Sequence, residues 1–192
     1  MNKLKKNIII SLMGVDGSGK TTLAKHLQKK FNNSKYLHLK PYILFQDRRT
    51  VVKTPHFQKK SFFILSLLRL LSWLISYKVF FYQSKQKNLF FFDRYAHDIL
   101  IDPLRYKHGL SQNLTKFILH FFPKPDLWIF LNPPIKTIKL RKLELPDNEL
   151  KRQIKFYKKF FTKQKNVLIL DTNIQKTKLI KKIVELINHL IK

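Results

Sequence analysis

The chain has 192 residues and a formal net charge of +28, because 39 Lys and Arg face only 11 Asp and Glu. This length fits one domain of ordinary size, and a hydrophobic share of 44% excludes a disordered basic tail. Cysteine is absent, which excludes a disulfide framework, thiolate zinc sites and a cysteine nucleophile. Its absence also fits a reducing compartment, so we expect a cytoplasmic protein.

The N-terminal segment has the pattern of a strand, a tight loop and a helix. Residues 7–13 form an apolar run that ends at a glycine-rich turn, and apolar residues then recur at helical spacing over residues 21–31. The apolar run, which follows several lysines, could instead belong to a signal peptide. We favour the strand, because no small-residue cleavage site follows the run and a charged Asp16 does.

Four further short apolar runs predict strands farther along the chain. They cover residues 36–39, 88–92, 127–131 and 167–170. Helical stretches lie between them, and this alternation favours a parallel sheet that is covered by helices on both faces. We therefore predict a three-layer α/β fold and a single domain over residues 1–192.

The longest apolar stretch, residues 62–82, is long enough to cross a membrane. Arg69 and Lys78 interrupt it, and its serines and Arg69 recur at steps of three or four as a narrow polar stripe. We expect the buried helix of a soluble domain. A helix that lies on a membrane surface is the second interpretation, and a true membrane span is the third.

Residues 14–21, Gly-Val-Asp-Gly-Ser-Gly-Lys-Thr, match the phosphate-binding pattern G-x-x-x-x-G-K-[ST] between the predicted strand and helix. Three of the four glycines in the chain fall here, namely Gly14, Gly17 and Gly19. Glycines let backbone amides approach phosphate oxygens, and the helix N-terminus adds partial positive charge. Lys20 would then reach the β- and γ-phosphates of a nucleoside triphosphate, and the Thr21 hydroxyl would ligate Mg²⁺. A glycine-rich turn without a ligand is the alternative.

Acidic residues are scarce, so their positions are informative. Asp93, Asp98 and Asp102 lie within ten residues, directly after the predicted strand 88–92. Asp93 at the carboxyl end of a central strand would face the same crevice as the glycine-rich loop and hold Mg²⁺ there, unless it caps the next helix. Arg94 would clamp an anionic group of the acceptor beside the γ-phosphate, unless it is a solvated surface arginine.

These residues resemble the thymidylate kinases and related nucleoside monophosphate kinases. Residues 14–22 resemble the family motif G-x-D-G-x-G-K-[ST]-T, and residues 93–95, Asp-Arg-Tyr, resemble its D-R-[YFH] motif. Pro-Asp-Leu at residues 125–127 before a strand, followed by a predicted helix over 134–143, is similar to the family's late core. In order and spacing the likeness runs over most of the chain.

The resemblance implies a five-stranded parallel sheet in a P-loop NTPase fold, with ATP and Mg²⁺ as the phosphoryl donor. It implies that Thr21 and Asp93 lie at the metal and that Arg94 contacts the phosphate of the acceptor. Asp16 would lie near the metal and the acceptor. The expected ATP-binding residues are Gly14, Asp16, Gly17, Ser18, Gly19, Lys20, Thr21 and Thr22.

A short lid over the donor phosphates is also implied, around residues 139–147. Arg141 would be its catalytic arginine, and lid closure would exclude water and favour transfer over hydrolysis. The alternative for Arg141 is a solvated helix face, because lysines occur on nearly every predicted helix. Residues 171–173, Asp-Thr-Asn, lie where such folds border the adenine.

The acceptor half departs from the family pattern. Asp98, Asp102 and Pro103 stand where thymidylate kinases carry the Ser, Tyr and Gln that help hold the thymine nucleotide. The family's R-E-P-G-G segment after the second strand has only a faint counterpart in residues 39–41, Leu-Lys-Pro.

Acids near the acceptor would repel a bare phosphate unless positive charges offset them. Mg²⁺ could do this, as could Lys40, Arg48 or Arg49. The acids could equally hydrogen-bond the hydroxyls of a sugar or another polyol. The identity of the acceptor is therefore open.

We predict an enzyme that transfers a phosphoryl group from ATP to a small acceptor, in the first place a nucleoside monophosphate such as dTMP. The first alternative is a kinase of the same fold that acts on a sugar or lipid-headgroup intermediate. The second is a basic ATPase that binds nucleic acid or a membrane, and the even spread of lysines without a nucleic-acid module disfavours nucleic acid. A peripheral membrane contact through residues 62–82 and a homodimer stay open.

Overall fold

The computed structural model describes residues 6–41, 56, 58–84, 88–141, 145–171 and 176–191. The chain forms two compact units. Unit 1 takes its described residues from Met1–His38, Ser84–Tyr95 and Lys124–Lys192, and unit 2 from Leu39–Gln83 and Ala96–Pro123. The single domain expected over residues 1–192 remains a prediction.

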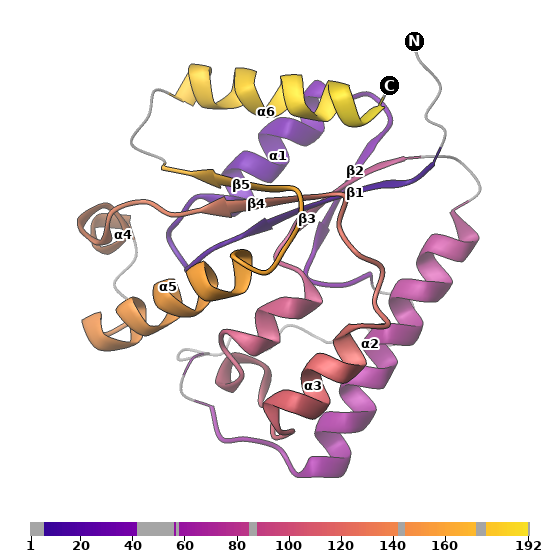
Figure 1. Ribbon diagram of the computed structural model, residues 1–192, viewed down its shortest axis with the longest axis vertical. Helices are drawn as coiled ribbons and strands as arrows, with labels where there is room; N and C mark the ends of the chain where they lie inside the picture. Colours follow the sequence, from indigo (N-terminus) through magenta and orange to yellow (C-terminus); the bar gives the residue numbers. More distant parts are fainter. Residues whose placement is uncertain are drawn as a thin grey trace. The chain divides into compact units, whose positions relative to one another are not determined.

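Unit 1 contains a five-stranded parallel sheet, as predicted. Its strands are β1 (Ile8–Met13), β2 (Ser34–His38), β3 (Leu89–Asp93), β4 (Leu127–Leu131) and β5 (Val167–Leu170). They lie in the order β2-β3-β1-β4-β5 (Figure 1). β1 and β3 are therefore neighbours in the middle of the sheet, and their carboxyl ends meet at one edge.

The helices of unit 1 are α1 (Lys20–Lys30), α4 (Ile135–Arg141), α5 (Asp147–Phe161) and α6 (Lys176–Ile191). α1 follows the glycine-rich loop directly, as the spacing of its apolar residues predicts. The helix that we expect over 134–143 is α4, and residues 142–144 of the expected lid lie outside the described residues.

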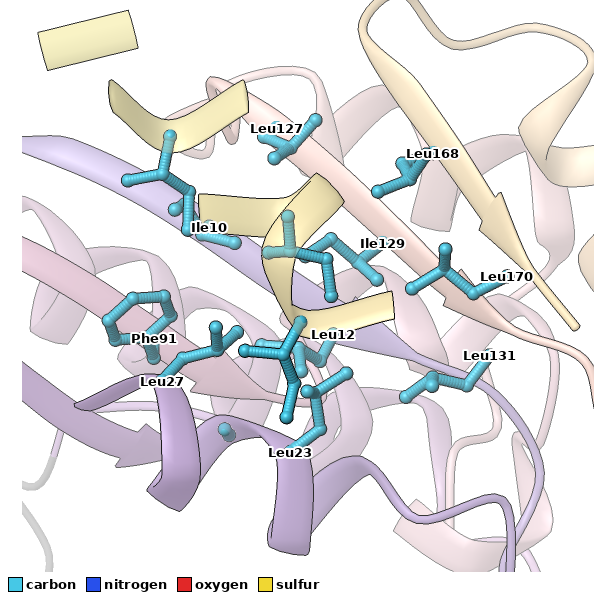
Figure 2. Packing of buried hydrophobic residues seen from close by; sticks show 14 of the residues in the cluster. Ile10, Leu12, Leu23, Leu27, Phe91, Leu127, Ile129, Leu131, Leu168 and Leu170 are labelled. Atoms are coloured by element: carbon cyan, nitrogen blue, oxygen red, sulfur yellow. The ribbon is translucent and has the colours of Figure 1, made fainter. Parts of the chain in front are cut away.

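One face of the sheet packs against α1 and α6. Figure 2 shows side chains from this layer, with Ile10 and Leu12 of β1 next to Leu23 and Leu27 of α1. The fully buried Ile10 and Leu12 are each expected to stabilise the fold by about 1.5–3 kcal/mol relative to an exposed side chain. This layer fastens α1, and with it the start of the helix that follows the loop, to the centre of the sheet.

The opposite face packs against α5 through aromatic rings. Phe130 of β4 stacks on Tyr157 and Phe161 of α5, with ring centroids 5.5 and 5.0 Å apart. Offset ring pairs of this kind add stability beyond the apolar area that they bury. Helices thus cover both faces, which confirms the predicted three-layer α/β architecture (Figure 1).

Unit 2 is helical. It contains α2 (Phe63–Gln83), the 3-10 helices η2 (Ala96–Leu100) and η3 (Leu104–Tyr106), and α3 (Gln112–Leu119). α3 contacts both α2 and η2. The Ser111 side chain caps α3 by accepting a hydrogen bond from the Leu114 amide, a role for which serine is favoured.

α2 is only partly buried, so the expectation of a buried helix is wrong for much of its surface. Of its most apolar 18-residue window, 28% is buried. The polar stripe faces inward instead: Ser66 Oγ accepts the Gly109 amide at 2.9 Å, and Arg69 donates to the Tyr106 carbonyl at 2.7 Å. The cause is the neighbouring loop, because its partly buried backbone groups take their polar partners from this side of the helix.

Candidate active site

The glycine-rich loop between β1 and α1 has backbone angles that only glycine adopts without strain. Gly14 has φ of +149° and Gly19, which precedes α1, has φ of +93°. A Cβ atom at Gly14 would lie 2.5 Å from the carbonyl oxygen of Leu131 at the end of β4. The loop can therefore pass β4 only with glycine at this position.

Lys20 is turned back into the loop, although it begins α1. Its side chain is 5% exposed, and its Nζ donates to the Val15 carbonyl at 2.7 Å and to Ser18 Oγ at 3.3 Å. The same nitrogen lies 3.9 Å from Asp16 Oδ1. The ammonium group is thus held within the segment whose amides would cradle phosphate oxygens.

Asp93 is the last residue of β3, and its side chain is buried. Its Oδ2 accepts hydrogen bonds from Thr21 Oγ1 at 2.5 Å and from the Tyr36 hydroxyl at 3.0 Å, and it lies 3.5 Å from His38 Nδ1. Its Oδ1 is also buried and has no hydrogen-bond partner among the described residues. These contacts come from β2 and α1, so Asp93 joins three elements of unit 1, and it is not used as a helix cap.

Electrostatics keep Asp93 ionised. Burial by itself raises the pKa of a carboxyl group, but hydrogen bonds from His38 and Thr21, together with the positive charges of Lys20 and His38, outweigh it. The pKa of Asp93 therefore lies well below its usual range. The carboxylate carries its negative charge at any pH at which the protein would work.

Arg94 is buried in unit 1 and has a left-handed backbone conformation, with φ of +72°. The alternative of a solvated surface arginine is wrong, since the residue is only 4% exposed. Its guanidinium pairs with Asp16 in the glycine-rich loop. Asp16 thus lies between the positive charges of Lys20 and Arg94, which ties the Asp-Arg pair at the end of β3 to the loop.

Arg141 ends α4 beside the loop. Its Nη1 lies 3.8 Å from the position that a Cβ atom at Gly19 would take. Lys139 on the same helix pairs with Asp147 at the start of α5, 2.6 Å away, so the two ends of the expected lid are joined. Asp171 follows β5 and is exposed.

The remaining expected site residues either lie in the glycine-rich loop and the first turn of α1 or fall outside the described residues. Ser18 is buried, Gly17 has φ of +80°, and Thr22 is exposed on the first turn of α1. Residues 142–144 of the lid, residues 172 and 173, and Arg48 and Arg49 lie outside the described residues.

Three further residues belong to this region although they were not predicted. Tyr36 and His38 reach Asp93 from β2, and the buried Tyr157 hydroxyl of α5 donates to the Gly14 carbonyl at 3.1 Å. The alternation in β2 places Tyr36 and His38 on one face, which was a usable signal. The pairing of His38 with Asp93 depends on strand register, which the local sequence does not specify.

The acids of the presumed acceptor half have partners within unit 2. Asp98 is 0% exposed and accepts from the Tyr106 hydroxyl at 2.6 Å. Asp102 is 3% exposed, pairs with His56 and accepts the Arg105 amide at 3.3 Å. Both carboxylates thus have partners inside unit 2, and that they hold the hydroxyls of an acceptor remains a prediction.

Lys40 of unit 2, one of the positive groups that could offset the acids, is also buried. It is 6% exposed, and its Nζ lies 5.5 Å from the centre of the Trp73 ring. This is a cation–π distance. Lys40 therefore contacts the Trp73 ring inside unit 2, and its role in offsetting the acids remains a prediction.

Comparisons with known proteins find similar structures but no similar family model or curated sequence. No protein-family model and no curated protein matches the sequence. A solved thymidylate kinase from Candida albicans is similar in structure, with a TM-score of 0.65 and 21% identity over 96% of this chain and 92% of that one.

Two other solved structures are also similar to this chain. Deoxyadenosine kinase from M. mycoides has a TM-score of 0.61 at 17% identity and covers 94% of this chain and 100% of its own. Thymidylate kinase from Ehrlichia chaffeensis has a TM-score of 0.59 at 17% identity, covering 95% and 99%. The chain therefore has the α/β fold of P-loop kinases, as the resemblance in its motifs predicted.

Proposed function

We propose that this protein is an ATP-dependent phosphotransferase whose acceptor is a nucleoside monophosphate such as dTMP. The observation that carries the proposal is the meeting of Lys20, Thr21 and Asp93 at the carboxyl ends of β1 and β3, where open α/β sheets bind ligands. Proteins of the same fold include thymidylate kinases and deoxyadenosine kinase, which supports a nucleotide or nucleoside acceptor over other small molecules, and the thymidylate kinases favour the nucleotide.

The donor site follows from the loop. Its backbone amides, with Gly17 and Gly19 in positive-φ conformations, would bind the phosphates of ATP. Lys20 would exchange its bond to the Val15 carbonyl for the β- and γ-phosphate oxygens. Ser18 and Thr22 would complete the phosphate contacts.

The residues at Asp93 fit Mg²⁺ that arrives with the nucleotide. Asp93 Oδ1 is buried, anionic and without a partner among the described residues, and the Thr21 hydroxyl lies beside the same carboxylate. No three His, Asp or Glu side chains gather as a metal cluster in the part of the chain that the structure describes. Mg²⁺ commonly uses one or two protein ligands plus phosphate oxygens and water, so this pair is sufficient. Bound there, Mg²⁺ would neutralise charge on the phosphates.

Two arginines would act on the transferred group. Arg94, which Asp16 holds against the loop, would contact the acceptor phosphate, and Arg141 would approach the donor phosphates from α4. In transfer, an acceptor phosphate oxygen forms a bond to the γ-phosphorus as the bond from that phosphorus to the β–γ bridging oxygen breaks, and ADP leaves. Positioning and charge neutralisation supply most of the catalysis of such steps.

The test is an ADP-release assay with Mg²⁺-ATP and a panel of acceptors. The panel contains deoxynucleoside and ribonucleoside monophosphates, nucleosides, and sugars and lipid headgroup alcohols. Turnover with a monophosphate, and formation of the matching diphosphate, supports the proposal. Activity on a hydroxylated acceptor alone would show that the protein is a kinase of a non-nucleotide acceptor. If no acceptor stimulated ADP release, the phosphotransferase assignment would be overturned.

A further inference from the structure

The outer side of α2 presents a continuous apolar surface. Ile64, Leu68, Leu71 and Ile75 recur at steps of four and three, which places them on one side of the helix, and they are 68, 58, 37 and 50% exposed. Exposed aromatic and aliphatic side chains at the N-terminal end, Phe62, Phe63 and Leu65, extend this surface. We call these seven residues the α2 apolar face. Contiguous exposed apolar surface on a folded protein indicates an interaction site.

Contacts on the opposite side of α2 hold the helix in this orientation, so the α2 apolar face stays on the outside. The opposite side of α2 is fixed by Leu70, Trp73 and Tyr77, which are at most 3% exposed, and by the polar stripe. The buried Ser66 and the half-buried Arg69 hydrogen-bond backbone groups of the loop at residues 106–109. Rotating the helix would leave these groups without partners, at a cost that apolar burial would have to exceed.

The charges around this face are of one sign. The acidic residues among the described residues of unit 2 are Asp98 and Asp102, and both are buried. The exposed charged side chains of the same described part are Lys59, Lys60, Lys78, Lys107 and Lys116. Lys59 and Lys60 stand directly before the α2 apolar face, and Lys78 follows Ile75 by three residues on the same side of the helix.

We propose that the α2 apolar face docks on an anionic membrane surface, with the helix lying in the plane of the lipid headgroups. Apolar side chains would enter the boundary of the acyl chains while the flanking lysines contact anionic headgroups, as in interfacial amphipathic helices. The uniform positive charge selects this occupant. A second copy would bring like charges together across the contact, in a chain whose net charge is +28.

By length and composition α2 could also cross a membrane, with a mean hydropathy of 1.6 over its most apolar window. The inward side of the helix favours surface docking. A spanning helix would have to give up the bonds of Ser66 and Arg69 to the loop and carry Arg69 into hydrocarbon. Lying in the interface keeps every one of these bonds.

The test is vesicle flotation of the full chain. Vesicles of phosphatidylcholine mixed with phosphatidylglycerol are compared with vesicles of phosphatidylcholine alone, at low and at raised salt. The test variant is Leu68→Gln with Ile75→Gln, and the matched control is Ile169→Gln, which changes an exposed isoleucine of β5 in unit 1. Circular dichroism and urea unfolding check that all three proteins are folded, and light scattering after size exclusion gives their oligomeric states.

We expect the wild type and the control to float with the anionic vesicles and to be released by salt. The double variant should bind about tenfold more weakly or worse, because two apolar side chains are lost from the contact. Its ADP-release activity in solution should not change, since neither residue is in the candidate active site. Equal binding to both vesicle types, no binding, or binding that the double variant retains would each overturn the proposal. The proposal would also be overturned if the wild type were a dimer, the double variant a monomer, and neither protein bound vesicles. The α2 apolar face would then be the contact with a second copy.

Discussion

The hydroxyl of Thr21 donates a 2.5 Å hydrogen bond to the carboxylate of Asp93, 72 residues later in the chain. Thr21 stands in the first turn of α1, and Asp93 ends β3. The parallel pairing of β1 with β3 sets Leu12 opposite Asp93 and so brings the loop after β1 to the end of β3. This contact is the basis of the metal site that we propose.

Replacement of Asp93 by Asn should reduce Mg²⁺-supported ADP release by about 10²-fold or more, because the ionised carboxylate is lost from the presumed metal site. A Mg²⁺ titration of activity measures the change, and we also expect a higher Mg²⁺ concentration at half-maximal rate. Glu185→Gln on the exposed side of α6 is the control for the loss of one negative charge. An unchanged Mg²⁺ profile in Asp93→Asn would place the metal elsewhere.

Lys20→Ala should abolish phosphoryl transfer and leave the fold intact. The ammonium group donates to Val15 and Ser18 of its own loop in unit 1, while the transition state would lose its main positive charge, a loss of about 10²–10³-fold in rate. Initial rates of ADP release and the circular dichroism spectrum are compared with those of Lys29→Ala, an exposed lysine on α1. Wild-type turnover by Lys20→Ala would show that the loop does not bind the donor.

Gly14→Ala should destabilise unit 1, because the new Cβ would lie 2.5 Å from the Leu131 carbonyl oxygen and the residue would keep a positive φ. Relief of the clash requires backbone shifts, so we expect a loss of about 1–3 kcal/mol in the free energy of unfolding. Urea unfolding followed by circular dichroism measures it. A midpoint equal to that of the wild type would mean that β4 and the loop can separate freely.

His108 should make stability fall in mild acid. Burial, and then the positive charges of Arg69 and Lys60, lower the pKa of His108 from 6.5 to about 4. The unfolded chain takes up a proton as the pH falls below the ordinary value, but the folded chain does not until the pH approaches the lowered value. The contribution of neutral His108 is therefore fully present above pH 6.5 and is lost between there and about pH 4.

The measurement compares His108→Gln with the wild type. The histidine Nε2 lies 2.7 Å from Thr115 Oγ1, whose own proton goes to the Ser111 carbonyl, so an amide donor can take its place. Between about pH 7.5 and pH 5 the wild type should lose about 2 kcal/mol more unfolding free energy than the variant. Equal losses in the two proteins would show that His108 does not titrate on unfolding.

The sequence alone was sufficient for most of unit 1. Each predicted apolar run overlaps a strand, and the clearest runs are those of β3 and β4, which lie between two helical layers and are buried at every position, a local property of the sequence. The glycine-rich loop was predictable for the same reason, because backbone angles such as those of Gly14 and Gly19 restrict the residue type at single positions.

The tertiary structure decided which side chains meet and which way α2 faces. The contacts of Tyr36 and His38 with Asp93 and the pairing of Asp16 with Arg94 depend on strand register and on loops closing over long separations. The orientation of α2 depends on the loop at residues 106–109, whose partly buried backbone groups take Ser66 and Arg69 as partners and leave the apolar side exposed. Hydrophobic pattern shows that a helix has two sides, but only its partners determine which side is inside, because unsatisfied backbone groups cost more than an exposed leucine.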